Sequence, residues 1–232
     1  MNIGGLIKTS LIDYPGMVSC VVFTQGCNFH CPYCHNPDLV PMTRSRSEMI
    51  EANHVLSFLE KRKGLLDAVV VSGGEPTLQK GLADFLRKVK AMGFRVKLDT
   101  NGSRPQVLRV LVAENLLDYV AMDLKTAPSR YAPDLWDKDD PATLLSSISI
   151  LMNASLDYEF RTTCLLPFTS PEALDEMLSY IQGAKRYVLQ PFKPGRTLDP
   201  AFFNHTTRAL EEKELQEIKH RSDSHVRECM IR

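Results

Sequence analysis

Short runs of apolar, often β-branched residues alternate along this chain with longer segments in which apolar residues recur every three to four positions. The short runs predict strands, and those that are apolar almost throughout predict strands covered on both faces. The longer, amphipathic segments predict helices. We expect strands at residues 18–23, 68–72, 95–99, 119–122, 159–163 and 187–190.

Each predicted strand is followed by a predicted helix, and the helix ends carry ordinary signals. Pro141 and Pro171 suit the first turn of a helix, and Gly64 and Gly93 suit the residue after the last turn. Ser47 precedes the first amphipathic run. We expect helices at residues 47–63, 79–92, 104–114, 141–152, 171–182 and 206–220.

Six strand–helix repeats predict parallel βαβ units with right-handed crossovers. A complete eight-fold barrel takes about 250 residues, so six repeats in 232 residues predict an α/β fold of the partial TIM-type (β/α)6 barrel kind, with parallel strands. A flat, doubly wound sheet is the alternative. The barrel is favoured because polar residues lie at or directly after the C-terminal end of every predicted strand. In barrel enzymes those ends form one active-site mouth.

Composition narrows the classes of protein. Lys plus Arg equals Asp plus Glu at 28 each, so the net charge is zero and a nucleic-acid binder is not expected. The segment 1–8 lacks a signal-peptide pattern, and no apolar run is long enough to span a bilayer, so no membrane partner is expected. These features predict a cytoplasmic protein with a single domain over residues 1–232.

Three of the six cysteines, Cys27, Cys31 and Cys34, lie within eight residues of one another. Such clustered thiols indicate a metal or redox site, and soft sulfur selects zinc, copper(I) or iron–sulfur. Iron–sulfur clusters normally take four cysteines, whereas only three are local here. A cubane on three cysteines leaves one iron open to an external ligand. The remaining cysteines are distant in sequence: Cys20, Cys164 and Cys229.

A structural zinc site is the alternative for these cysteines. Structural zinc is four-coordinate and closed, and either His30 or His35 could complete the ligand set. The triplet by itself is compatible with both metal sites.

The spacing Cys-x3-Cys-x-aromatic-Cys, with Tyr33 as the aromatic residue, resembles the signature of the radical S-adenosylmethionine superfamily. The resemblance implies a [4Fe–4S] cluster on Cys27, Cys31 and Cys34, in a cluster-binding loop at 26–36. It also implies that the open iron binds S-adenosylmethionine, which is cleaved to a 5′-deoxyadenosyl radical. Tyr33 is then expected to contact the cofactor.

The strings 9–16 (TSLIDYPG) and 22–27 (VFTQGC) resemble the glycyl-radical-enzyme activases, most closely those of anaerobic ribonucleoside-triphosphate reductase. This resemblance implies an enzyme that generates a glycyl radical on a partner protein, with a flavodoxin- or ferredoxin-type electron donor. A radical enzyme acting on a small molecule, similar to 7-carboxy-7-deazaguanine synthase, shares the cofactor motifs. A zinc-binding module is the alternative from another class.

Two further motifs support the resemblance to the radical S-adenosylmethionine superfamily. The resemblance implies that Gly73, Gly74 and Glu75, which follow an apolar strand, bind the amino group of S-adenosylmethionine. A tight turn between strand and helix is the structural alternative. The resemblance also implies that Asp99 and Asp123 bind a monovalent cation beside the cofactor, although an aspartate that caps a helix is an ordinary alternative.

Further residues are assigned by the same resemblance. Lys125, in an Asp-x-Lys pattern with Asp123, is expected near S-adenosylmethionine as a cofactor-binding residue, with a solvated lysine as the alternative. Arg161 is expected to bind the cofactor carboxylate or ribose, or else to pair with one of the aspartates. Lys193 replaces the histidine of the pyruvate formate-lyase activases.

Two longer loops, 126–140 and 192–204, follow the fourth and sixth predicted strands. Loops at such positions commonly recognise substrates. Tyr131, Trp136 and Arg196 are therefore candidate contacts for a partner, and simple covering of the barrel edge is the alternative.

Overall fold

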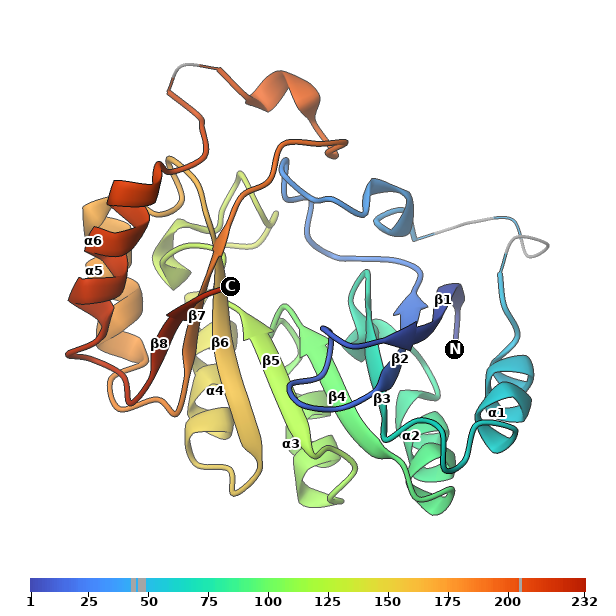
Figure 1. Ribbon diagram of the computed structural model, residues 1–232. Helices are drawn as coiled ribbons and strands as arrows, with labels where there is room; N and C mark the ends of the chain where they lie inside the picture. The colour runs from blue at the N-terminus through green and yellow to red at the C-terminus, as the bar shows by residue number, and fades with distance from the viewer. Residues whose placement is uncertain (43–44, 46–48, 205) are drawn as a thin grey trace. The chain divides into compact units, whose positions relative to one another are not determined.

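The computed structural model describes residues 1–42, 45, 49–204 and 206–232. Contacts between residues divide the chain into two compact units, each with its own strands and helices (Figure 1). Unit 1 comprises Met1–Asn28, Asp38–Thr100 and Gln106–Val120, and unit 2 comprises Phe29–Pro37, Asn101–Pro105 and Ala121–Arg232.

Strands β1 to β4 pair in chain order in unit 1. Strand β1 is antiparallel to β2, whereas β2, β3 and β4 are mutually parallel. The register pairs Val22 with Val71 and Val70 with Lys97. Because the parallel strands end together, the polar residues that follow them reach one edge of the unit. The bounds are Ile3–Ser10 (β1), Ser19–Thr24 (β2), Ala68–Gly73 (β3) and Arg95–Thr100 (β4).

Helices α1 and α2 contact each other, and α2 also contacts β4. Apolar residues of α2, among them Phe85, Leu86 and Val89, are buried. The predicted helix start at Ser47 lies outside the described residues, and the described helix begins at Ala52. The bounds are Ala52–Glu60 (α1), Leu82–Ala91 (α2) and Pro105–Ala113 (α3).

Strands β6, β7 and β8 are parallel in unit 2, with Tyr187 of β7 paired to Phe160 of β6 and to Cys229 of β8. Strand β5 begins in unit 1, and its last three residues belong to unit 2. The bounds are Tyr119–Asp123 (β5), Asp157–Cys164 (β6), Tyr187–Pro191 (β7) and Cys229–Ile231 (β8).

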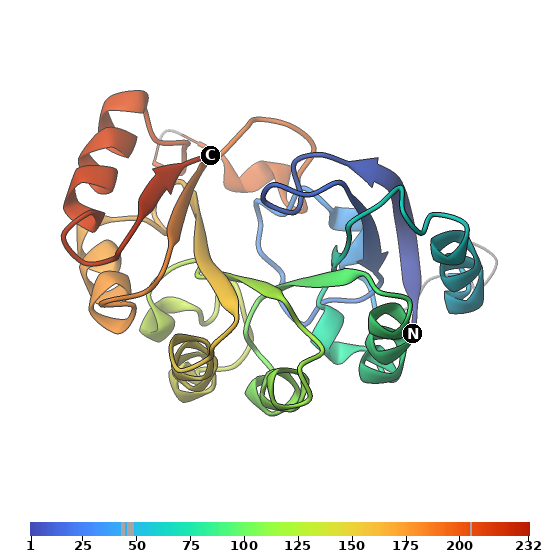
Figure 2. The same ribbon diagram turned by 60° about the horizontal axis from the view of Figure 1, so that its bottom comes forward.

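The helices of unit 2 lie outside its strands (Figure 2). Asp140 and Ser170 cap α4 and α5 by accepting from backbone N–H groups, and the predicted prolines occupy the first turns. None of the described helices is long and apolar enough to cross a membrane. The bounds are Pro141–Met152 (α4), Pro171–Tyr180 (α5) and Glu212–Ser222 (α6). Short 3-10 helices span Pro37–Leu39, Pro76–Leu78, Pro128–Arg130 and Pro200–Phe202.

All six predicted strands form, as β2 to β7, but β1 and β8 were not predicted. The last helix starts later than predicted, at Glu212 rather than near Thr206. Glu211 and Glu214 form a capping box that fixes this start. Upstream, the backbone of Ala209 bridges to that of Leu165, which removes it from the helix.

Candidate functional site

The cysteine segment, residues 27–34, follows β2. None of its three thiols forms a disulfide; Cys31 is buried, and Cys27 and Cys34 are partly exposed. The amide of Cys27 donates to Val40 O at 3.0 Å, and the amide of Cys34 donates to Cys31 O at 3.0 Å. Three cysteine thiols so close in the chain are a donor set that fits an iron–sulfur cluster.

The two candidate zinc histidines are engaged elsewhere. Nε2 of His30 donates to Pro133 O at 2.8 Å, and Nε2 of His35 donates to Lys193 O at 2.9 Å. The described residues contain no group of three or more His, Cys, Asp or Glu side chains that could hold a single metal ion. A four-iron cluster spreads its ligands over separate iron atoms, so its cysteines need not converge on one point.

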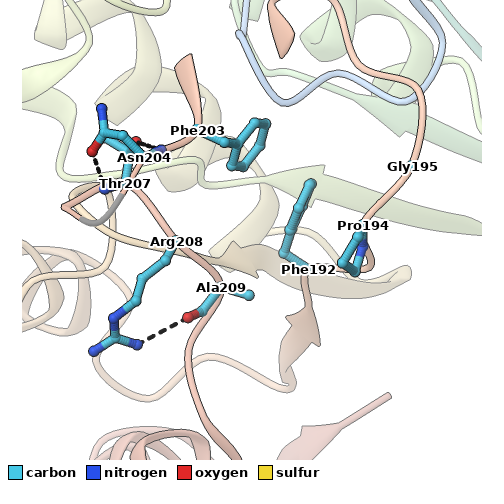
Figure 3. Close-up of a pocket in the computed structure, with 8 residues that line it drawn as sticks. All are labelled: Phe192, Pro194, Gly195, Phe203, Asn204, Thr207, Arg208 and Ala209. Atoms are coloured by element: carbon cyan, nitrogen blue, oxygen red, sulfur yellow. Dashed lines mark hydrogen bonds between the residues drawn. The ribbon is translucent and has the colours of Figure 1, made fainter. Parts of the chain in front are cut away.

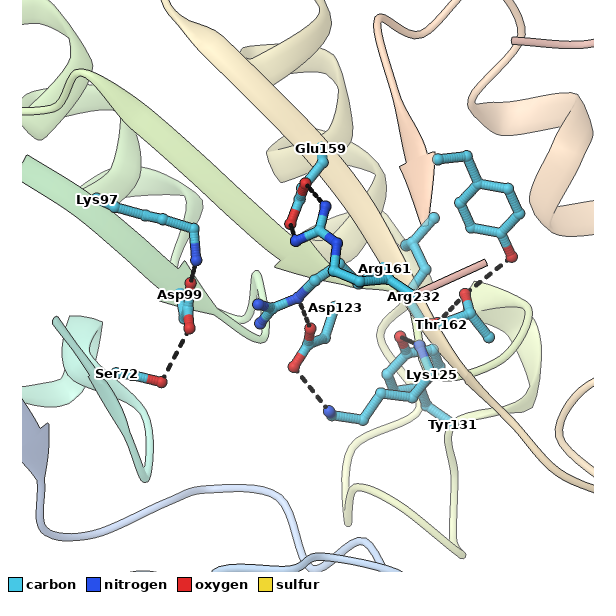
Figure 4. A network of polar contacts seen from close by, with 12 residues as sticks. Ser72, Lys97, Asp99, Asp123, Lys125, Tyr131, Glu159, Arg161, Thr162 and Arg232 are labelled. Atoms are coloured by element: carbon cyan, nitrogen blue, oxygen red, sulfur yellow. Dashed lines mark hydrogen bonds and ion pairs between the residues drawn. The ribbon is translucent and has the colours of Figure 1, made fainter. Parts of the chain in front are cut away.

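Asp123, the last residue of β5, lies between two cations of unit 2 (Figure 4). Nε of Arg161 donates to its Oδ1 at 2.9 Å, and Nζ of Lys125 donates to its Oδ2 at 3.1 Å. Burial raises the pKa of Asp123, but the charges and hydrogen bonds of Arg161 and Lys125 outweigh burial and lower it to about 2. Asp123 therefore pairs with both Lys125 and Arg161. The expected contact of Arg161 with the cofactor stays a prediction.

Lys125 also acts on the cysteine segment. Burial lowers the pKa of Lys125, but Asp123, Cys31, Tyr33 and Tyr131 together outweigh burial and hold that pKa well above its usual range. Burial raises the pKa of the Cys31 thiol to about 11, and the charge of Lys125 opposes this rise. Lys125 thus supplies positive charge that favours a Cys31 thiolate, which is the form that binds iron.

The Gly-Gly turn after β3 packs directly against the backbone that leads to Cys27. Gly73 has φ +111°, and a Cβ there would overlap the backbone of Thr24. A Cβ on Gly74 would overlap the carbonyl groups of Gly26 and Leu39. Close backbone packing within unit 1 therefore requires both glycines, whether or not a ligand is bound.

Glu75 is fully buried, and its carboxylate serves the turn itself. Oε1 accepts from Thr77 N at 3.0 Å, from Thr77 Oγ1 at 2.5 Å and from Thr100 Oγ1 at 2.8 Å. The side chain thereby caps the 3-10 helix that begins at Pro76. These bonds hold the Gly-Gly-Glu backbone in a fixed conformation.

Asp99 of β4 has two polar partners in unit 1 (Figure 4). Nζ of Lys97 lies 2.5 Å from its Oδ1, and Ser72 Oγ donates to its Oδ2 at 3.1 Å. Lys97 was not predicted from the sequence, because only the polar residue at the end of this strand, Asp99, was considered. The signal was available: residues i and i+2 of a strand share a face, which places Lys97 beside Asp99.

The contacts of Asp99 and Asp123 do not test the predicted monovalent cation. Each carboxylate already pairs with a protein cation: Lys97 pairs with Asp99, and Lys125 and Arg161 pair with Asp123. Charge neutralisation at either residue therefore does not require an added ion.

Tyr33, between two motif cysteines, is buried with its ring 5.3 Å from that of Phe168. Its hydroxyl has no hydrogen-bond partner among the described residues. Buried polar atoms are normally satisfied, so this hydroxyl fits a position beside a bound group.

Two of the predicted partner contacts are wrong. Tyr131 and Trp136 are buried and pack on Phe29, with ring centroids 5.6 Å and 5.2 Å away. The Tyr131 hydroxyl accepts from the amide of Lys125 at 2.8 Å. Both rings therefore support the site from within unit 2, whereas Arg196 is exposed and stays a prediction.

A polar hollow of about 410 Å³ lies at the carboxyl ends of β6 and β7 in unit 2. Its lining includes His35, which directly follows Cys34, and the cations Lys193 and Arg232. Thr163 and Gln190 add neutral polar groups. A polar or anionic ligand suits such a lining.

A second hollow, of about 400 Å³, is apolar on one side (Figure 3). The rings of Phe192 and Phe203 stack there with centroids 4.9 Å apart. On the other side Arg208 donates to Ala209 O at 2.9 Å. The role of loop 192–204 in recognition stays a prediction.

The comparisons with known proteins agree with this site. The model of the Radical SAM superfamily matches residues 21–181. A protein of Methanocaldococcus jannaschii, named as a glycyl-radical enzyme activating enzyme, is 33% identical over 205 residues, which cover 86% of this chain and 83% of that protein. The 7-carboxy-7-deazaguanine synthase of Thermococcus kodakarensis is 27% identical over 190 residues, covering 73% and 72% of the two chains.

Among solved structures, Streptococcus suis SuiB bound to S-adenosylmethionine has a similar fold, with a TM-score of 0.65 at 13% identity. The match covers 90% of this chain and 48% of that chain. It confirms the predicted α/β class with parallel strands. The family match over more than half of the residues, together with the cysteine triplet that falls inside it, shows that the chain belongs to the Radical SAM superfamily.

Proposed function

We propose that this radical SAM enzyme is an activase, which generates a glycyl radical on a partner enzyme, and that the partner is an anaerobic ribonucleoside-triphosphate reductase. The observation that carries the activase function is the 33% identity to the named activating enzyme over most of both chains. The choice of reductase rests on the resemblance of segments 9–16 and 22–27 alone.

Superfamily membership implies a [4Fe–4S] cluster and S-adenosylmethionine. When bound and given one electron by an external donor, they would supply a 5′-deoxyadenosyl radical and methionine, and that radical would take a hydrogen atom from the Cα of a partner glycine. In this proposal Cys27, Cys31 and Cys34 hold the cluster as thiolates. No further cysteine cluster is present in the sequence, as suits an activase with one cluster.

The chain's own residues would prepare this site. Lys125 offsets the negative charge of the Cys31 thiolate, and the ion pairs of Asp123 with Lys125 and Arg161 fix the ammonium in position. The proposed contact of Tyr33 with S-adenosylmethionine is supported by its buried, unpartnered hydroxyl.

As the family resemblance implies, Gly73, Gly74 and Glu75 are proposed to bind the amino group of S-adenosylmethionine. The buried role of the Glu75 carboxylate favours backbone carbonyl groups for this contact, with the side chain fixing their conformation. Asp99 is assigned to the same cofactor.

The test is electron paramagnetic resonance of a candidate reductase after anaerobic incubation with the reconstituted protein, S-adenosylmethionine and reduced flavodoxin or ferredoxin. A glycyl-radical signal is expected. The control is the same reductase with its radical-bearing glycine replaced by alanine, which should give none. Cleavage of the cofactor without any reductase radical would contradict the proposed partner.

The second candidate function is synthesis of a small molecule, favoured by the match to the 7-carboxy-7-deazaguanine synthase over 73% of this chain. Mass spectrometry of the small-molecule products separates the two functions. Formation of 7-carboxy-7-deazaguanine in the absence of any protein partner would support this candidate over the activase.

A further inference from the structure

Lys97 is an unusual residue for its position. It lies in the middle of β4 between the buried residues Val96 and Leu98, and its own side chain is only 2% exposed. Lysine is almost never fully buried unless it is paired, because desolvation of its charge is costly. A specific partner must therefore compensate for its burial.

That partner is Asp99, two residues further along the same face of the strand. The ammonium lies 2.5 Å from Asp99 Oδ1, and the Asp99 side chain is 13% exposed. Ser72 of the neighbouring strand donates to the second oxygen at 3.1 Å. The ring of Tyr119 lies 6.0 Å from the Lys97 ammonium and adds a weak attraction for the cation.

This geometry leaves little need for a free cation at Asp99. A bound Na⁺ or K⁺ would have to sit on the same carboxylate as the ammonium. Two like charges a few ångströms apart in a poorly solvated place repel strongly. Because Lys97 is part of the strand, its positive charge is present whichever salt the buffer contains.

We propose that Lys97 is a built-in counter-cation of Asp99 and replaces the monovalent cation that the family resemblance implies at this residue. Lys97 is thus a positioning residue, which balances the charge of Asp99 and orients its carboxylate. Consequently, binding of S-adenosylmethionine does not depend on Na⁺ or K⁺. The inference rests on the proposed place of Asp99 beside the cofactor, and not on the identity of the partner enzyme.

The first test measures the dissociation constant of S-adenosylmethionine for the reconstituted protein by equilibrium dialysis. The buffers contain NaCl, KCl or tetramethylammonium chloride at equal ionic strength. We expect the three constants to agree within about twofold. A constant that is weaker by about tenfold or more in tetramethylammonium than in Na⁺ or K⁺ would overturn the proposal.

The second test measures melting temperatures of the cluster-free full-length chain, and it does not require a working cofactor site. Lys97→Met leaves the carboxylate without its ammonium and is expected to lower the melting temperature by roughly 10 °C. Lys97→Arg should retain most of the stability. The double variant Lys97→Met/Asp99→Asn should recover part of the loss, because it removes both charges.

The dependence of the melting temperature on the type of cation distinguishes a residue that supplies positive charge from one that only fills space. Na⁺ or K⁺, compared with tetramethylammonium, should raise the melting temperature of Lys97→Met but not that of the double variant or the wild type. If the double variant is no more stable than Lys97→Met, the pairing is not what Lys97 provides. Absence of S-adenosylmethionine binding in every buffer would instead contradict the proposed function, and the melting series would still decide the role of Lys97.

Discussion

The amide nitrogen of Glu75 donates a hydrogen bond of 2.8 Å to the carbonyl oxygen of Gly26, the residue directly before Cys27. Next to it, the amide of Gly74 donates to Thr24 O at 2.9 Å. The Gly-Gly-Glu turn is therefore fastened by its backbone to the start of the cysteine segment. Gly26 and Glu75, which lie 49 positions apart in the sequence, are thereby joined within unit 1.

Gly74→Ala should destabilise the protein, because the new Cβ overlaps the carbonyls of Gly26 and Leu39. Overpacking against backbone costs about 1–3 kcal/mol, which urea unfolding of the cluster-free chain can measure. The matched control is Gly195→Ala, where a Cβ meets no atom within 4 Å. Equal stability of the two variants would show that the close approach at Gly74 is not a constraint.

The three motif cysteines should be the ones that hold iron. Replacement of Cys27, Cys31 or Cys34 by alanine should abolish retention of the cluster after anaerobic reconstitution, as measured by iron content and visible absorption. Cys20, Cys164 and Cys229 lie outside the motif and are buried within their units. Cys229→Ala is the control and should keep its iron; loss of iron in that variant would mean that the ligand set is wrong.

The ion pair of Asp123 makes a defined contribution to the pH dependence of stability. Its pKa is lowered from 3.8 to about 2, so the ionised form is favoured by folding. The stabilisation is fully present above the unfolded-state pKa, near pH 4, and is lost as the pH falls toward 2. It amounts to about 2 kcal/mol.

Asp123→Asn isolates this contribution. The difference in unfolding free energy between the wild type and the variant, measured on the cluster-free chain, should be largest above pH 4 and should shrink as the pH approaches 2. A difference that stays constant over this range would show that the carboxylate is not held ionised by Arg161 and Lys125.

The ring of Phe192 should protect the proposed cluster of the cysteine segment from air. It stacks on His35 with centroids 5.1 Å apart, next to Cys34, and it also stacks on Phe203. Phe192→Ala should therefore loosen the segment and speed the bleaching of the cluster in air. Tyr180→Ala, on the outer face of α5, is the control. Equal bleaching rates for both variants would contradict this role of the stack.

Much of the fold follows from local pattern. Strands β2 to β7 are short apolar runs bounded by polar turns, so their positions could be predicted from sequence. Strand β1 could not, because Gly4 and Gly5 interrupt its pattern and its pairing to β2 is antiparallel. Strand β8 has three residues, and only its register with β7 defines it as a strand.

Contacts in the candidate site could be predicted from the sequence where the two residues are close neighbours in the chain. Asp123 and Lys125 are two residues apart, and they do pair. Arg161 lies far away in sequence, so its choice of Asp123 depends on tertiary structure. The burial of Tyr131 and Trp136 depends on Phe29, which no local pattern connects to them.

The most direct measurement of the central claim is the formation of 5′-deoxyadenosine. The protein is reconstituted anaerobically with iron and sulfide, reduced in the presence of S-adenosylmethionine, and the products are separated by chromatography. We predict 5′-deoxyadenosine and methionine in equal amounts from the wild type, and none from Cys31→Ala. A wild-type protein that carries its cluster, binds S-adenosylmethionine and yet yields no 5′-deoxyadenosine would contradict the account.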